Sequence, residues 1–114
     1  MSTPPPMTVQ IKLVDGQAIA DPVSVSVSQA ETYLAFSLLI PGLRFADTGP
    51  IQVPPAYAGS FLGPWKISAN NASLLDLNNL AGEVPYTVTV VGASGTPYTL
   101  AISPPPTIVN SGPQ

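Results

Sequence analysis

The chain has 114 residues, no cysteine, no histidine and nine charged side chains, with a net charge of −3. This length fits one domain with its own hydrophobic core. The missing residue types exclude disulfides, thiolate and imidazole metal ligands, and catalysis by Ser-His-Asp or Cys-His groups. The three basic residues are scattered, which argues against a nucleic-acid surface. No apolar run approaches the ~20 residues that span a bilayer, so we expect no membrane partner.

The scarcity of charge is the most unusual feature of the composition. An average domain of this size would carry about 28 charged residues. Either neutral polar side chains keep the surface soluble, or neighbouring subunits cover much of it. Because surface charge keeps proteins apart in solution, its scarcity favours association, and we expect a homo-oligomer.

The predicted elements begin after a proline-rich stretch, residues 1–6. Apolar and polar residues alternate over residues 8–13 and again over 23–28, which is the pattern of half-buried strands. Residues 32–40 are apolar on both faces and end at Pro-Gly, which predicts a central strand. The short apolar run 51–53 lies between prolines, a position typical of an edge strand.

The second half of the chain continues the strand patterns. Residues 65–69 and 73–77 are candidate strands, and residues 86–91 and 97–102 form the clearest predicted hairpin, joined by a loop with glycine at both ends. Residues 107–109 are the candidate for a last strand. Frequent turn residues between many short strands predict a sandwich or a small barrel.

We therefore predict an all-β fold, an immunoglobulin-like β-sandwich of about seven to nine short antiparallel strands. Its expected organisation is an arm at residues 1–6, a sandwich domain at 7–109 and a flexible tail at 110–114. Pro4, Pro5 and Pro6 are either part of a flexible end or an arm that docks on a neighbouring subunit.

Residues 73–90 carry a resemblance to a known family. An apolar strand is followed by Leu80, a short turn containing Gly82, and Tyr86 at the start of an alternating strand. This pattern resembles fibronectin type III and related immunoglobulin-like domains. The resemblance implies a tyrosine corner, in which the Tyr86 hydroxyl bonds to the backbone a few residues upstream. It covers the C-terminal third of the chain, and the position of the only tryptophan, Trp65, departs from the family pattern.

Carboxylates are the remaining candidates for chemistry. Asp15 with Asp21, or Asp76 with Glu83, could form a glycosidase-like pair, but turn geometry explains the first two better, and Asp76 is interpreted as an outward strand residue. Calcium needs only oxygen ligands, yet the acidic residues are scattered. We expect no enzyme activity, no metal site and no cofactor.

The stretch 54–65 is the most suggestive surface, because it places aromatic residues among prolines and glycines. Exposed aromatics on loops mark contact sites, and the candidate binding residues are Tyr57, Phe61, Leu62 and Trp65. The alternative is that this loop folds back and closes one end of the sandwich.

Two functional hypotheses follow. The first is a structural assembly protein, most concretely a virion accessory protein that decorates and stabilises a bacteriophage capsid by burying surface between subunits. The residues at the N-terminus lack a basic start and an apolar run, so we expect synthesis in the host cytoplasm without a signal peptide. The second is an extracellular module that binds carbohydrate or protein through its aromatic loop residues.

Overall fold

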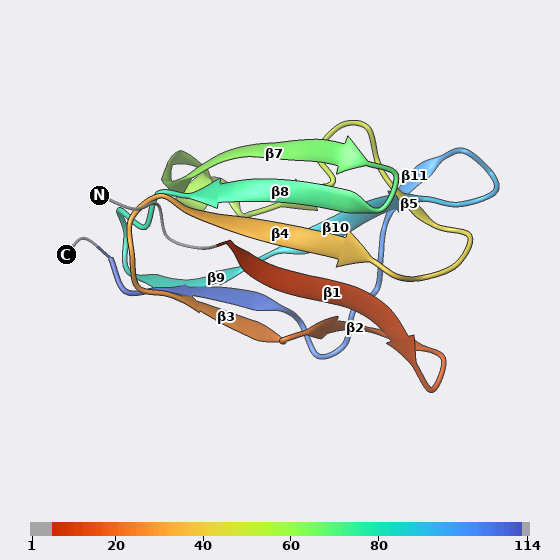
Figure 1. Ribbon diagram of the computed structural model, residues 1–114, viewed down its shortest axis with the longest axis horizontal. Coiled ribbons are helices and arrows are strands. Elements are labelled where there is room, and N and C mark those ends of the chain that lie inside the picture. The colour runs from red at the N-terminus through yellow and green to blue at the C-terminus, as the bar shows by residue number, and fades with distance from the viewer. Residues whose placement is uncertain (1–5, 113–114) are drawn as a thin grey trace.

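Two layers of strands face each other in the computed structural model, which describes residues 6–112 (Figure 1). The first layer is a five-stranded sheet in the order β2-β1-β4-β8-β7. Its strands are β1 (Met7–Val14), β2 (Gln17–Asp21), β4 (Thr32–Leu38), β7 (Phe61–Ser68) and β8 (Asn71–Asp76). Within residues 6–112 there is no helix with the length and hydropathy that crossing a lipid bilayer requires.

The second layer is built from two smaller sheets that are joined where one strand of the first leads directly into a strand of the second. One has the order β3-β12-β9, and the other has the order β11-β10-β5 with β6 also paired to β10. Only Tyr86 separates β9 from β10, so the two sheets run into each other. The strands are β3 (Ser24–Val27), β5 (Arg44–Phe45), β6 (Ile51–Gln52), β9 (Gly82–Pro85), β10 (Thr87–Val91), β11 (Pro97–Thr99) and β12 (Thr107–Asn110), and one 3₁₀ helix, η1 (Pro55–Ser60), precedes β7.

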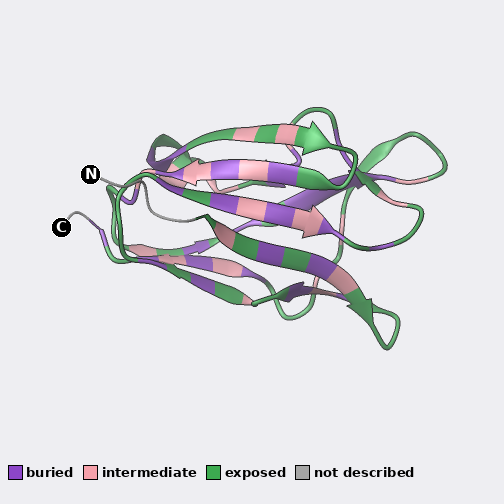
Figure 2. Ribbon diagram, viewed as in Figure 1, coloured by how far each residue is buried: buried purple, intermediate pink, exposed green. Residues whose placement is uncertain are grey.

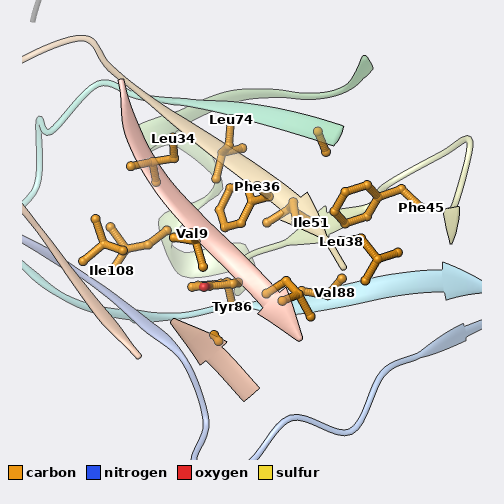
Figure 3. Close-up of a cluster of buried hydrophobic side chains, with 14 of the residues drawn as sticks. Val9, Leu34, Phe36, Leu38, Phe45, Ile51, Leu74, Tyr86, Val88 and Ile108 are labelled. Atoms are coloured by element: carbon orange, nitrogen blue, oxygen red, sulfur yellow. The ribbon is translucent and has the colours of Figure 1, made fainter. Parts of the chain in front are cut away.

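The core lies between the layers, and alternate residues of β2, β3, β4, β8 and β12 point into it (Figure 2). On β4 the inward residues Leu34, Phe36 and Leu38 are at most 1% exposed. Figure 3 shows Phe36 above Tyr86, and their rings meet edge to face with centroids 5.3 Å apart. Such edge contacts add to the stabilisation that burial of the two rings provides.

The predicted all-β sandwich is confirmed, and most predicted strands are present, whereas β2 and β9 were not predicted and β7 begins at Phe61, earlier than predicted. In β3 the two valines are 2% exposed while the serines face solvent. The predicted hairpin forms between β10 and β11, with Val91 opposite Pro97. Asp15 and Gly16 both have positive φ angles, 52° and 78°, and connect β1 to β2 as a two-residue turn.

Two strand pairings are parallel, which the prediction of antiparallel strands did not include. β1 pairs with β4, and β3 pairs with β12, in parallel register. The cause is the path of the chain, because β3 crosses to the second layer before β4 returns to the first. The number of strands is also higher than the predicted seven to nine. Residues 6–112 contain twelve, because several short strands form where the chain changes layers.

Tyr86 is buried as the resemblance implies, but among the described residues its hydroxyl makes no bond to the backbone. Tyr86 is 3% exposed, and its hydroxyl has no hydrogen-bond partner within residues 6–112. Burial raises the pKa of this phenol. The backbone supplies the link that the hydroxyl does not, since the Tyr86 N–H donates to the Pro106 carbonyl at 3.2 Å. Leu80 is 46% exposed and Gly82 begins β9, so neither packs in the core.

The ends of the chain lie partly outside the described residues. Pro4 and Pro5 of the expected arm are not described, and Pro6 is exposed. Of the expected tail, Asn110 completes β12 and is buried, and Gly112 is buried as well. A side chain at Gly112 would lie 2.9 Å from the Ala81 Cβ, so this part of the chain packs closely against the β8–β9 connection.

Phe36→Ala should lower the free energy of unfolding by about 3–5 kcal/mol, because it leaves a cavity and removes the ring contact with Tyr86. Urea titration followed by far-ultraviolet circular dichroism measures this loss. The matched control is Ile67→Ala, since Ile67 is 67% exposed and should change stability by no more than about 0.5 kcal/mol. Equal losses in the two variants would contradict this description of the core.

Candidate functional site

An apolar row crosses the outward face of the first layer. In the strand register Leu62 of β7 lies opposite Leu75 of β8, and Leu75 lies opposite Tyr33 of β4. All three side chains therefore stand on one face of neighbouring strands, where cross-strand neighbours are in contact distance. Trp65 joins the row diagonally, with its ring centroid 6.3 Å from that of Tyr33. These four residues are named the outer apolar patch.

The outer apolar patch is exposed to an unusual degree for such large side chains. Leu62 is 50%, Trp65 43% and Tyr33 42% exposed, and Leu75 is partly buried between them. Figure 2 shows that β7 is exposed or intermediate along almost its whole length, whereas β4 and β8 alternate with buried residues. Contiguous apolar side chains on a surface mark sites of interaction, in contrast to single exposed ones.

The local sequence of β7 explains how Trp65 comes to lie on this face. β7 is an edge strand, and its pairing with β8 shifts register between Leu62 and Trp65. Gly63 has a φ of 97°, and a Cβ at this position would lie 2.9 Å from the Trp65 ring. The indole therefore packs against the Gly63 backbone, and a larger residue there would displace it.

Charged groups on the same face lie at its other side. Lys12 of β1 donates to Asp21 of β2 at 2.9 Å. The row of Leu62, Leu75 and Tyr33 lies on β7, β8 and β4 instead. Polar side chains also follow the patch along its own strands, where Asn71 of β8 lies opposite Ser37 of β4 and Ser68 of β7. Apolar side chains bordered by polar ones resemble the apolar centre and polar rim of protein interfaces.

The structure divides the aromatic stretch that the sequence singled out. Leu62 and Trp65 belong to the outer apolar patch, whereas Phe61 is 7% exposed and packs in the core. Tyr57 of η1 is partly buried against the core. Part of this stretch is thus exposed and part packs inward, and its role as a contact site stays a prediction. The sequence analysis did not single out Tyr33 and Leu75. The signal that could have found them is that each is an apolar residue on the face of its strand that points away from the core.

A cavity of about 220 Å³ lies where β6 separates from β10. Extending the antiparallel register beyond Gln52 and Thr87 would place Pro54 opposite Pro85. Neither proline has an N–H, so the strand pairing ends and a gap opens. The cavity is lined by Gln52, Val53, Pro54, Pro85 and Thr87, and none of these side chains ionises.

The carboxylates considered for catalysis do not converge. Asp76 is fully buried, which corrects its interpretation as an outward strand residue, while Glu83 is exposed. Asp21 binds Lys12, and Asp15 occupies the turn between β1 and β2. Within residues 6–112 no three acidic side chains gather in a group that could hold a metal ion.

No protein-family model matches the chain, and no curated protein matches it either. Function is therefore inferred from the surface of the protein itself.

The exposure of Trp65 can be measured directly, because it is the only tryptophan in the sequence. We expect acrylamide to quench its fluorescence efficiently, and Tyr33→Ala to increase the quenching further by uncovering one side of the indole. Tyr98→Ala is the control, since Tyr98 is 45% exposed but lies in the second layer. Quenching as weak as that of a buried indole would contradict the existence of the outer apolar patch.

Proposed function

We propose that this protein is a non-enzymatic assembly protein that buries the outer apolar patch against another protein subunit. The observation that carries the proposal is the exposed row of Leu62, Leu75 and Tyr33 with Trp65 beside it. Tryptophan and tyrosine are the residues that contribute most to protein interfaces when they lie at the centre of the buried area.

The rest of the surface supports the same proposal. Nine charged residues in 114 leave large areas without the charge that keeps proteins apart in solution. A sheet face is also a rigid surface, so that little conformational entropy is lost when a partner covers it. Without histidine the chain lacks the side chain most often used as general base, and without cysteine it lacks a thiolate nucleophile.

The more specific form of the proposal is a capsid accessory protein of a virion. It acts as a homo-oligomer or against capsid subunits, and belongs among immunoglobulin-like sandwiches. The two-layered all-β fold and the exposed patch support this form. A protein that binds only the assembled shell stabilises it by linkage, because disassembly must first break the contacts.

Light scattering from micromolar to millimolar protein tests the proposal. The wild type should form a dimer or larger oligomer, and Trp65→Ala should weaken association by at least about 2 kcal/mol, roughly 30-fold in the dissociation constant. Tyr98→Ala is the matched control and should associate like the wild type. A monomer at all concentrations contradicts self-association. In that case the protein is mixed with assembled capsid shells and sedimented. If the protein does not sediment with the shells, the assembly proposal as a whole is contradicted.

Carbohydrate binding is the second candidate, and the aromatic pair on the sheet face favours it. Aromatic rings can stack on sugar rings, but those of Tyr33 and Trp65 are inclined by 47° and do not form one flat platform. Affinity electrophoresis in gels that contain soluble polysaccharides tests this alternative. Retardation that Trp65→Ala and Tyr33→Ala both abolish, and that Tyr98→Ala leaves unchanged, would establish carbohydrate as the ligand.

A further inference from the structure

A buried polar cluster joins the two layers at one end of the sandwich, and it is separate from the outer apolar patch. Asp76 is the last residue of β8 in the first layer, and Asn110 is the last residue of β12 in the second. Asp76 is 0% and Asn110 4% exposed. The Asn110 Nδ2 donates to the Asp76 Oδ1 at 3.0 Å, so this bond connects the layers.

Asn78 completes the cluster and ties it to two further segments. Its backbone N–H donates to the Asp76 Oδ1 at 2.8 Å. Its side-chain oxygen accepts the N–H of Gly112 at 2.9 Å, and its Nδ2 lies 3.4 Å from the carbonyls of Val27 and Gln29. The end of β3, the β8–β9 connection and the residues after β12 therefore meet at this cluster.

Two oxygens in the cluster have no hydrogen-bond partner among the described residues, namely Asp76 Oδ2 and Asn110 Oδ1. They belong to the two side chains that are already joined through their other atoms. The Asp76 Oδ1 accepts two hydrogen bonds, which is the capacity of a carbonyl oxygen. The two unpartnered oxygens are both acceptors, and of the two only the carboxyl oxygen of Asp76 can take up a proton and so become a donor.

No basic side chain balances a negative charge on Asp76. Lys12 is paired with Asp21 and Lys66 with Asp47, while Arg44 is exposed on β5. The strands that pair with β8 at this point place Thr32 and Phe61 opposite Asp76, and the nearby acidic residues Glu31 and Glu83 are exposed. An ionised carboxylate here would be buried without a counter-charge, which is strongly unfavourable.

We propose that Asp76 is protonated in the native protein and donates its Oδ2 hydrogen to the Asn110 Oδ1. The carboxyl and the amide then form a pair with two hydrogen bonds, which clasps β8 to β12 across the sandwich. In this state both unpartnered oxygens are satisfied, and no charge is buried. The clasp loses one of its two hydrogen bonds when the proton leaves.

The direction of the pH dependence follows from this pairing. Burial raises the pKa of Asp76, and the hydrogen bonds from Asn78 and Asn110 offset this only in part. The unfolded chain releases the proton near the ordinary aspartate pKa, whereas the folded chain retains it to higher pH. The stability that the clasp contributes is thus complete below the unfolded pKa, and it is lost as the pH rises through the folded pKa.

Asp76→Asn tests the proposal, because the introduced amide offers the same oxygen acceptor and a permanent N–H donor towards the Asn110 Oδ1. We expect this variant to melt at the same temperature as the wild type at pH 3.5. At pH 8 it should melt higher, by roughly 5 °C for each tenfold difference in proton affinity between the folded and unfolded wild type. Melting is followed by circular dichroism, and the difference between the two proteins is plotted against pH so that other carboxylates cancel.

Asp47→Asn is the matched control with the opposite sign. The hydrogen bond and charge of Lys66 hold the pKa of Asp47 below its ordinary value, so its contribution is present at neutral pH and is lost in acid. This control variant should therefore melt at or below the wild-type temperature at pH 8. An Asp76→Asn variant that is less stable than the wild type at pH 8 overturns the proposal.

A second measurement keeps the test decisive if Asp76→Asn does not fold. In wild-type protein labelled with ¹³C, the Asp76 carboxyl resonance should keep its protonated position well above the ordinary aspartate pKa; titration at or below that pKa overturns the proposal. Addition of Ca²⁺ is the remaining arm. A rise in the wild-type melting temperature at pH 8 that Asp76→Asn abolishes would assign the two oxygens to a bound cation instead.

Discussion

The packing of the two layers depends on the inward face of β4, the central strand of the first layer, against which the second layer lies. β4 lies at the centre of the five-stranded sheet, and its residues Leu34, Phe36 and Leu38 are almost completely buried. The edge contact between Phe36 and Tyr86 joins this strand to the point where β9 runs into β10. The second layer, although divided into two small sheets, is therefore held over one continuous core, which accounts for its short strands remaining ordered.

The same strand has a second face, and there the packing stops. Tyr33 emerges from β4 on the outside of the sheet, where β8 and β7 place Leu75 and Leu62 beside it. Within residues 6–112 no second layer covers this face, so the alternation that builds the core on one side builds the outer apolar patch on the other (Figure 1). A single structural rule, the period of two along a strand, thus produces both the stability of the domain and its proposed binding surface.

The scarcity of charge connects the patch with the buried cluster. On the surface, the small number of charges means that apolar side chains lack charged neighbours, which would otherwise oppose association. Two of the three basic residues are paired with Asp21 and Asp47 at the surface, Arg44 is exposed, and none neutralises the buried Asp76. Asp76 is therefore paired with an amide, and a proton takes the role that a lysine or arginine has in many other proteins.

The sequence by itself determined the all-β class, most strand positions, the turn at Asp15 and Gly16, and the aromatic stretch that contains Leu62 and Trp65. These features are local, because alternation and turn chemistry depend on residues that are close along the chain. Only the tertiary structure decided which strands are neighbours. The parallel pairs, the meeting of Tyr33 with Trp65 and the bond from Asn110 to Asp76 each join residues more than 30 positions apart or follow from a change of layer. Such contacts depend on the path of the chain between layers, and no local pattern specifies that path.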